Sequence, residues 1–268
     1  MSRLIRLSPS FREKIWGVND LRPWFAPRPE RIGEVWFLPP EPLPLPILVK
    51  FIYTSALLSV QVHPDDAYAK ACGDLSGKTE MWYVLRADPG SKLAMGLKTK
   101  VTREQLRQAA TSGEIENLLQ WFPVTKDQVY FIPPGTLHAL GAGIVVCEIQ
   151  QNADITYRLY DYGRPRELHL EKALGVASLE PYPGPIMPEG SQLASCDYFI
   201  AERIRLEPND RTVLRPRRCD LLIVLEGHGT ASEAVVSSGD VWLLPETQQE
   251  VVITAGTPIV ALRAFLPS

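Results

Sequence analysis

Short β-type runs separated by turn residues restrict the fold of this chain more than any other feature. Each run is rich in β-branched and aromatic residues, and the turns between them fall at the intervals of a β-sandwich or barrel. The runs lie at 57–62, 81–85, 128–132, 144–149, 220–225, 241–244, 250–254 and 259–264. The pattern predicts a mainly β protein.

Helical periodicity is confined to a small part of the chain. The one convincing helical stretch is 102–119, where Thr102 and Gln105 have the spacing of a capping box. A shorter helix is expected at 170–177. Five prolines between positions 39 and 46 exclude a helix or a central strand there, so we expect an extended connection between an N-terminal cap and the first core strands.

A weak internal repeat indicates two lobes. Segments 127–133 and 239–245 each consist of a turn, an apolar strand and a proline, and upstream 80–85 resembles 220–225. We interpret them as two related β-barrel lobes, residues 1–181 and 182–268. The alternative is chance, because amphipathic strands that end in proline look alike.

Composition narrows the classes of partner. The chain has 268 residues and a net charge of −3, so it has no basic field to hold nucleic acid, although a small pocket can be locally positive. No apolar run approaches the length that a bilayer requires, and the first residues lack a signal-peptide core. Four scattered cysteines without a CxxC pair indicate reduced thiols. We expect a cytoplasmic protein without a nucleic-acid or membrane partner.

Four residues could hold a metal ion. Residues 133–138 fit the pattern PxGxxH, in which a tight turn delivers His138 to the next strand. Gln61 and His63 are two apart on a strand and share a face, and Glu80 heads the following apolar strand. Each alone is more often a structural residue, but two imidazoles, one carboxylate and one amide oxygen together suit zinc.

The charge of this set favours a chemically active ion. One carboxylate against a divalent ion leaves about +1, which keeps the ion a Lewis acid towards a carbonyl or hydroxyl. The corresponding segment of the second lobe, 245–250, has neither the glycine nor the histidine. We therefore expect one ion per chain and a structural second lobe.

Several segments resemble one known family. The strings LSVQVHPDD, GKTEMWYVL, PPGTLHALGAG and EIQQNADITYRLYDYGR, with KIWG and IGEVW before them, are similar in type, order and spacing to the signatures of the type I mannose-6-phosphate isomerases. The resemblance covers most of residues 11–172 and is nearest to the short bacterial members. It implies two cupin-type (jelly-roll) barrel lobes and a zinc-dependent isomerase that interconverts mannose 6-phosphate and fructose 6-phosphate, small-molecule sugar phosphates.

The resemblance also implies roles for individual residues. As metal ligands it implies Gln61, His63, Glu80 and His138. As catalytic residues it implies Arg158, Lys78 and Glu148. As substrate-binding residues it implies Lys50, Ser59 and Asp154. The stretch LYDYGR after Arg158 departs from the glycine-rich continuation of longer members, so the residues that contact phosphate stay open.

The reaction itself limits what these residues can do. Aldose–ketose isomerisation moves a proton between adjacent carbons through an enediol, so the developing enolate oxygen needs stabilisation and a base must carry the proton. The metal and Arg158 would stabilise the oxygen, while Lys50 and Lys78 could orient hydroxyls or bind phosphate. Glu148, Asp154, a metal-bound water and a lysine all remain possible bases.

Two other functions use the same barrel. A cupin oxygenase would hold iron in a site with open positions for oxygen, and the Gln61 position with the lysine and arginine set argues against it. A non-catalytic, metal-stabilised sugar-binding cupin would need the pocket but not Arg158. The pattern is compatible with a monomer or a homodimer.

Overall fold

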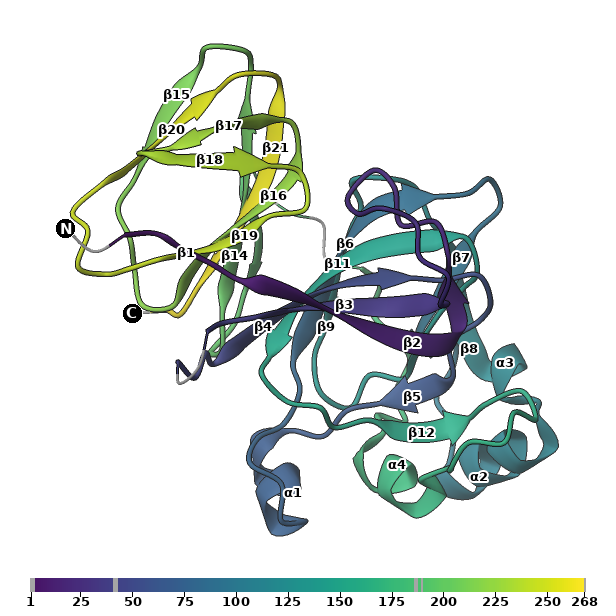
Figure 1. Ribbon diagram of the computed structural model, residues 1–268. Helices are drawn as coiled ribbons and strands as arrows, with labels where there is room; N and C mark the ends of the chain where they lie inside the picture. The colour runs from purple at the N-terminus through teal and green to yellow at the C-terminus, as the bar shows by residue number, and fades with distance from the viewer. Residues whose placement is uncertain (1–2, 41–42, 186–187, 189, 268) are drawn as a thin grey trace. The chain divides into compact units, whose positions relative to one another are not determined.

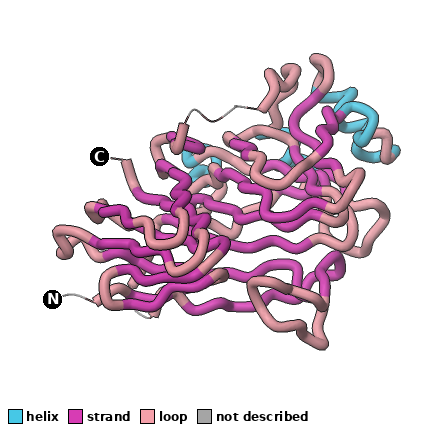
Figure 2. The backbone as a smooth tube through the Cα atoms, turned by 90° about the horizontal axis from the view of Figure 1, so that it is seen from above, coloured by secondary structure: helices cyan, strands magenta, loops and turns pink. Residues whose placement is uncertain are grey.

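A computed structural model describes residues 3–40, 43–185, 188 and 190–267. The chain forms two compact units: Met1–Glu13, Asn19–Lys50 and Met187–Ser268 make the first, and Lys14–Val18 with Phe51–Ile186 make the second. Strands dominate both, which confirms the predicted mainly β class (Figures 1 and 2). Among the described helices, none has the length and apolarity to cross a membrane. All four cysteines are free thiols, as expected.

The second unit is built from two groups of antiparallel strands. In one group β6 lies between β9 and β11. In the other, five strands follow the order β12-β5-β10-β7-β8. The bounds are β5 Val60–Val62, β6 Glu80–Ala87, β7 Lys92–Leu97, β8 Leu119–Pro123, β9 Val129–Ile132, β10 His138–Leu140, β11 Ile144–Gln151 and β12 Tyr157–Tyr160.

Strand alternation gives the five-stranded sheet two different faces. Val60, Val62 and Ala139 point to one face and pack against helical residues such as Leu106 and Leu174. Gln61 and His138, which alternate with them, therefore point to the opposite face. That face also carries Leu140 and Met95, which share a core cluster with Trp82 of β6 and Val146 of β11.

The helices confirm most of the predicted helical segment and correct its extent. The capping box of Thr102 and Gln105 begins α2 (Arg103–Ser112), but Gly113 at φ 85° ends it, so 102–119 is not one helix. A Cβ at Gly113 would lie 2.9 Å from the Tyr160 hydroxyl. The short α3 (Ile115–Leu118) follows, and α4 (Leu170–Val176) confirms the second predicted helix. The sequence did not reveal α1 (Asp66–Ala71).

The first unit also has two groups of antiparallel strands. Their orders are β1-β19-β16-β21-β14-β13 and β15-β20-β17-β18. The bounds are β1 Ile5–Arg6, β13 Gln192–Ser195, β14 Ile200–Leu206, β15 Arg211–Leu214, β16 Asp220–Glu226, β17 His228–Ala231, β18 Ala234–Ser237, β19 Val241–Leu244, β20 Val251–Ala255 and β21 Ile259–Phe265. Three further strands are β2 Ser8–Val18, β3 Ile32–Leu38 and β4 Ile47–Tyr53.

The two units repeat one topology. The order β9-β6-β11 in the second unit corresponds to β19-β16-β21 in the first, and β5-β10-β7-β8 corresponds to β15-β20-β17-β18. The register agrees as well, because Glu80 is opposite Ile132 and Asp220 is opposite Leu244. This repetition confirms two related barrels.

The compact units do not follow the predicted division of the chain at a single point. The boundary between residues 181 and 182 stays a prediction, and compactness groups Met1–Glu13 and Asn19–Lys50 with the C-terminal segment. In the proline run, residues 39–40 and 43–46 form neither helix nor strand, and Pro42 lies outside the described residues.

Candidate metal centre and active site

Paired strands bring the predicted metal ligands to one place. Gln61 is the middle residue of β5, His63 follows that strand directly, and His138 begins β10 as the Cα partner of Gln61. Glu80 begins β6. The turn that delivers His138 contains Gly135 at φ 83°, whose N–H donates to the carbonyl of His63 at 2.9 Å.

Three of the four predicted ligands form a tight buried group. The donor atoms of His63, Glu80 and His138 all lie within 4.8 Å of one another. Each imidazole Nε2 is 3.5 Å from a Glu80 carboxylate oxygen, and none of the three residues is more than 1% exposed. Gln61 lies beside them, with its Nε2 3.2 Å from His138 Nε2 and its Oε1 accepting from Ser59 Oγ at 3.4 Å.

Backbone carbonyls orient both imidazoles. Nδ1 of His63 is 2.8 Å from the Ile155 carbonyl, and Nδ1 of His138 is 2.9 Å from the Thr136 carbonyl. A carbonyl only accepts, so in a neutral ring the proton is on Nδ1 and the bare Nε2 faces Glu80. Burial lowers the pKa of His138 to about 4, which keeps this ring neutral and able to bind a metal ion near neutral pH.

Two predicted catalytic residues adjoin this group. The Lys78 ammonium contacts a Glu80 carboxylate oxygen, and its Nζ lies 3.2 Å from His63 Nε2 and 3.7 Å from Glu148 Oε1. Glu148 is on β11 opposite Trp82, whose indole N–H donates to Glu148 Oε2 at 2.8 Å. A buried lysine and two buried carboxylates therefore lie next to the two histidines.

Arg158 lies on β12 opposite Gln61, so the predicted catalytic arginine is on the strand next to the group. Its Nη1 donates to the Glu167 carbonyl at 2.6 Å, while its buried Nε has no hydrogen-bond acceptor among the described residues. Burial lowers the pKa of Arg158, and the nearby Arg166 adds to the effect. The Nε–H is thus a donor suited to a ligand oxygen.

Sequence reasoning missed a charged cluster beside Arg158. Arg164 and Arg166 both pair with the buried Asp161, and Arg166 does so through two hydrogen bonds of 2.6 Å. Arg164 also donates to the Leu57 carbonyl at 2.8 Å, which ties it to the segment before β5. The available signal was the density of arginine between positions 158 and 166.

Two further predicted substrate-binding residues belong to other segments of the chain. Lys50 is a buried residue of β4 in the first unit, with its Nζ 4.4 Å from the centroid of the Trp36 ring. Asp154 is exposed in the segment between β11 and β12. Their roles stay predictions.

Known proteins resemble the chain closely. No profile of a protein family matches it. It is 35% identical to a mannose-6-phosphate isomerase of Streptococcus mutans over 67% of this chain and 69% of the relative, and 32% identical to mannose-6-phosphate isomerase ManA of Bacillus subtilis over 88% and 91%. The crystal structure of the Bacillus subtilis mannose 6-phosphate isomerase superposes with a TM-score of 0.86 at 27% identity, covering 99% of this chain and 100% of that one.

A more distant structure shares the fold. A mutant of phosphomannose isomerase from Salmonella typhimurium superposes with a TM-score of 0.76 at 16% identity over the full length of both chains. The two sequence relatives carry the assignment, since each is more than 30% identical and covered over more than two thirds of its length. The chain is therefore an enzyme of the mannose-6-phosphate isomerase family, a family of aldose–ketose isomerases.

Proposed function

We propose that this chain is a zinc-dependent isomerase that interconverts mannose 6-phosphate and fructose 6-phosphate through an enediol. The observation that carries the proposal is the buried group of His63, Glu80 and His138 in a chain of this family. Two Nε2 donors, one carboxylate and the neighbouring amide of Gln61 fit the preferences of zinc. No second such group of histidines, cysteines and carboxylates occurs among the described residues, so we propose one ion per chain.

When bound, the ion would act as a Lewis acid on the substrate carbonyl or hydroxyl oxygen. The protein groups around it would balance charge. Glu80 is completely buried, and a buried carboxylate requires a cation or several donors. Lys78 supplies one such charge. Its distance of 3.7 Å from Glu148 gives it an alternative carboxylate partner when a metal ion takes up Glu80.

We assign proton transfer to the pair of Lys78 and Glu148. Both groups are buried beside the proposed ligands, and the indole of Trp82 fixes the Glu148 carboxylate. Asp154 is exposed, so its carboxylate lacks the desolvation that raises the strength of a base. The two groups are 3.7 Å apart, so they could pass a proton between them once they close to hydrogen-bond distance, and either could return it to the neighbouring carbon.

Arg158 would stabilise the charge that develops on the enolate oxygen. Its buried Nε–H has no acceptor among the described residues, which supports a hydrogen bond to substrate. A guanidinium keeps its charge at all relevant pH values, so it can act as an electrostatic stabiliser without exchanging a proton.

The phosphate would bind to the arginines beside Arg158. Arg164 and Arg166 face a single carboxylate, Asp161, which leaves the cluster positive. We expect Arg166→Ala to raise KM for mannose 6-phosphate by about tenfold with little change in kcat, because phosphate binding is shared by ground state and transition state. Arg107→Ala, which removes an exposed ion pair to Glu171, is the matched control. An unchanged KM for Arg166→Ala would contradict this assignment.

Turnover before and after chelation tests the whole proposal. Purified protein should form fructose 6-phosphate from mannose 6-phosphate, lose this activity with a chelator and regain it with added zinc. A strict requirement for oxygen would favour the cupin oxygenase. Metal-dependent binding with the sugar phosphate recovered unchanged would favour the non-catalytic cupin. The predictions of a cytoplasmic protein and of a monomer or homodimer are independent of this test.

A further inference from the structure

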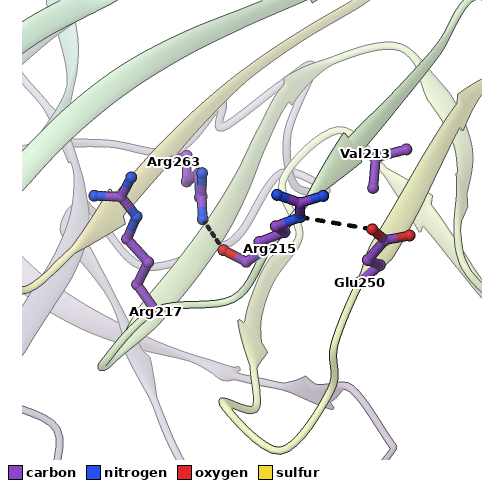
Figure 3. A pocket seen from close by; sticks show the side chains of 5 residues that line it. All are labelled: Val213, Arg215, Arg217, Glu250 and Arg263. Carbon is purple, nitrogen blue, oxygen red and sulfur yellow. Dashed lines mark hydrogen bonds and ion pairs between the residues drawn. The ribbon is translucent and has the colours of Figure 1, made fainter.

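The first unit contains a charged pocket that the proposed reaction does not use. Its volume is about 410 Å³, and Figure 3 shows three guanidinium side chains and one carboxylate around it. This volume is within the range of pockets for small metabolites. The lining residues are Val213, Arg215, Arg217, Glu250 and Arg263.

Strand register places this pocket where the other barrel has its metal group. Asp220 begins β16 as Glu80 begins β6, and each is opposite the residue before a proline. Arg263 is the partner of Leu222 in the same way that Glu148 is the partner of Trp82.

The remaining lining residues follow the same correspondence. Leu214 pairs with Val251, so the next residues, Arg215 and Glu250, occupy the positions of Gln61 and His138. Arg217, two residues on, corresponds to His63. The pocket is thus the counterpart of the metal group, with arginines in place of Gln61 and His63 and carboxylates in place of Glu80 and His138.

An internal cation takes the place of a metal ion at the base of this pocket. Asp220 is completely buried and accepts from Arg263 Nε at 3.0 Å, from Arg263 Nη2 at 2.6 Å and from the backbone N–H of Arg217 at 2.9 Å. Arg263 is 7% exposed. Its Nη1 is 3.6 Å from Glu202, beyond hydrogen-bond distance, and so keeps donor capacity.

The two other arginines supply charge that is available to a ligand. Arg215 is 84% exposed, and its Nε is 3.6 Å from Glu250, an exposed pair that a ligand can replace at little cost. The Arg217 guanidinium lies 4.6 Å from the centroid of the Phe265 ring. No described carboxylate forms an ion pair with it. Asp220 and Glu202 balance the charge of Arg263, so Arg215 and Arg217 provide the positive charge that a ligand can bind.

We propose that this pocket binds a small phosphorylated metabolite, with the phosphate held between Arg215 and Arg217 above Arg263. A planar guanidinium group binds phosphate oxygens through two parallel hydrogen bonds. Two guanidinium groups carry a charge of +2, which matches a phosphate dianion better than it matches a singly charged carboxylate. The binding needs no metal ion, because Arg215, Arg217 and Arg263 supply the positive charge and two of the four positions that correspond to metal ligands carry guanidinium groups. The site is separate from the proposed isomerase centre.

Calorimetric titration of the full chain with glycerol 3-phosphate tests this proposal. The wild type should bind one more molecule per chain than the double variant R215Q/R217Q, or bind at least about tenfold more tightly. R218Q, which changes an exposed neighbouring arginine outside the pocket, should match the wild type. Thermal unfolding would establish that both variants fold. Equal stoichiometry and affinity in R215Q/R217Q would overturn the proposal, as would equally tight binding of glycerate at this site.

Discussion

The two barrels of this chain share a topology and differ in what they place around one buried carboxylate. Glu80 and Asp220 begin corresponding strands and are both completely buried. Around Glu80 stand two imidazoles and a lysine, whereas Asp220 is bound by the guanidinium of Arg263. A buried carboxylate needs a positive partner, and the two barrels meet that need differently.

The difference shows how little of the chemistry the barrel itself dictates. Strand pairing provides equivalent positions in both units, and the residue types at those positions decide the result. Imidazole Nε2 atoms can bind a metal ion that exchanges with solvent. A guanidinium is covalently part of the chain and always charged, so the barrel of the first unit has a permanent cation beside the corresponding carboxylate.

Alanine substitution at one equivalent position of the two barrels, His138 or Glu250, should produce the largest contrast. His138→Ala removes one imidazole from the metal group, so metal content and turnover should both fall to background. Glu250→Ala, at the corresponding position of the other barrel, should change neither. Elemental analysis and a turnover assay measure the two effects. Full metal occupancy in His138→Ala, or two ions per wild-type chain, would break the comparison.

Removing the Asp220 carboxylate should affect the stability of the protein and leave its metal content unchanged. Asp220→Asn removes the carboxylate to which the buried Arg263 guanidinium is hydrogen-bonded and leaves only Glu202 at 3.6 Å, so the free energy of unfolding should decrease by about 3–5 kcal/mol. Metal content should stay at one ion per folded chain. Arg215→Gln, which removes an exposed ion pair of the same barrel, should cost less than about 1 kcal/mol. Chemical denaturation measures both values, and metal loss in Asp220→Asn would show that the barrel of the first unit also contributes to metal binding.

Substitution of Arg158 should separate the contribution to catalysis from the contribution to folding in the barrel that holds the metal group. Arg158→Ala is expected to lower kcat by about a hundredfold, roughly 2.7 kcal/mol, because it removes one stabiliser of developing charge. Metal content and melting temperature should stay near the wild-type values. The exposed Arg211 of β15 offers a matched arginine-to-alanine control. A defect in KM alone would make Arg158 a phosphate ligand, and unchanged kinetics would refute its assignment.

The smallest expected effect is a pH dependence of the metal-free protein. Burial lowers the pKa of His138 from 6.5 to about 4, so between these values the unfolded state binds a proton that the folded state does not. The stability contribution is complete above pH 6.5 and is lost as the pH falls towards 4. We expect a loss of about 1–2 kcal/mol between about pH 7 and pH 5.

Two variants isolate this effect. His138→Gln should flatten that part of the pH profile, while His228→Gln, an exposed histidine of the other barrel, should leave it unchanged. Denaturation at several pH values gives the slopes. If the free energy of unfolding has the same pH dependence in the wild type and in His138→Gln, protonation of His138 does not cause it.

Much of this protein follows from local patterns in its sequence. The alternation of the short runs predicts the strands, the Thr102 capping box predicts where α2 begins, and PxGxxH places His138 at a strand start. Such features depend on neighbours within a few residues. The resemblance between 80–85 and 220–225 likewise predicts two barrels, because each segment begins a central strand.

Other features depend on residues far apart in the chain, and only the tertiary structure decides them. The helix ends at Gly113, where a side chain would meet Tyr160. Arg263 meets Asp220 across 43 positions because β21 pairs with β16 in one register. Glu148 approaches Lys78 in the same way, because β11 pairs with β6. Sequence alone determined which residues could bind a metal ion, and strand register decided which charges face one another, because pairing over long separations leaves no local periodic signal.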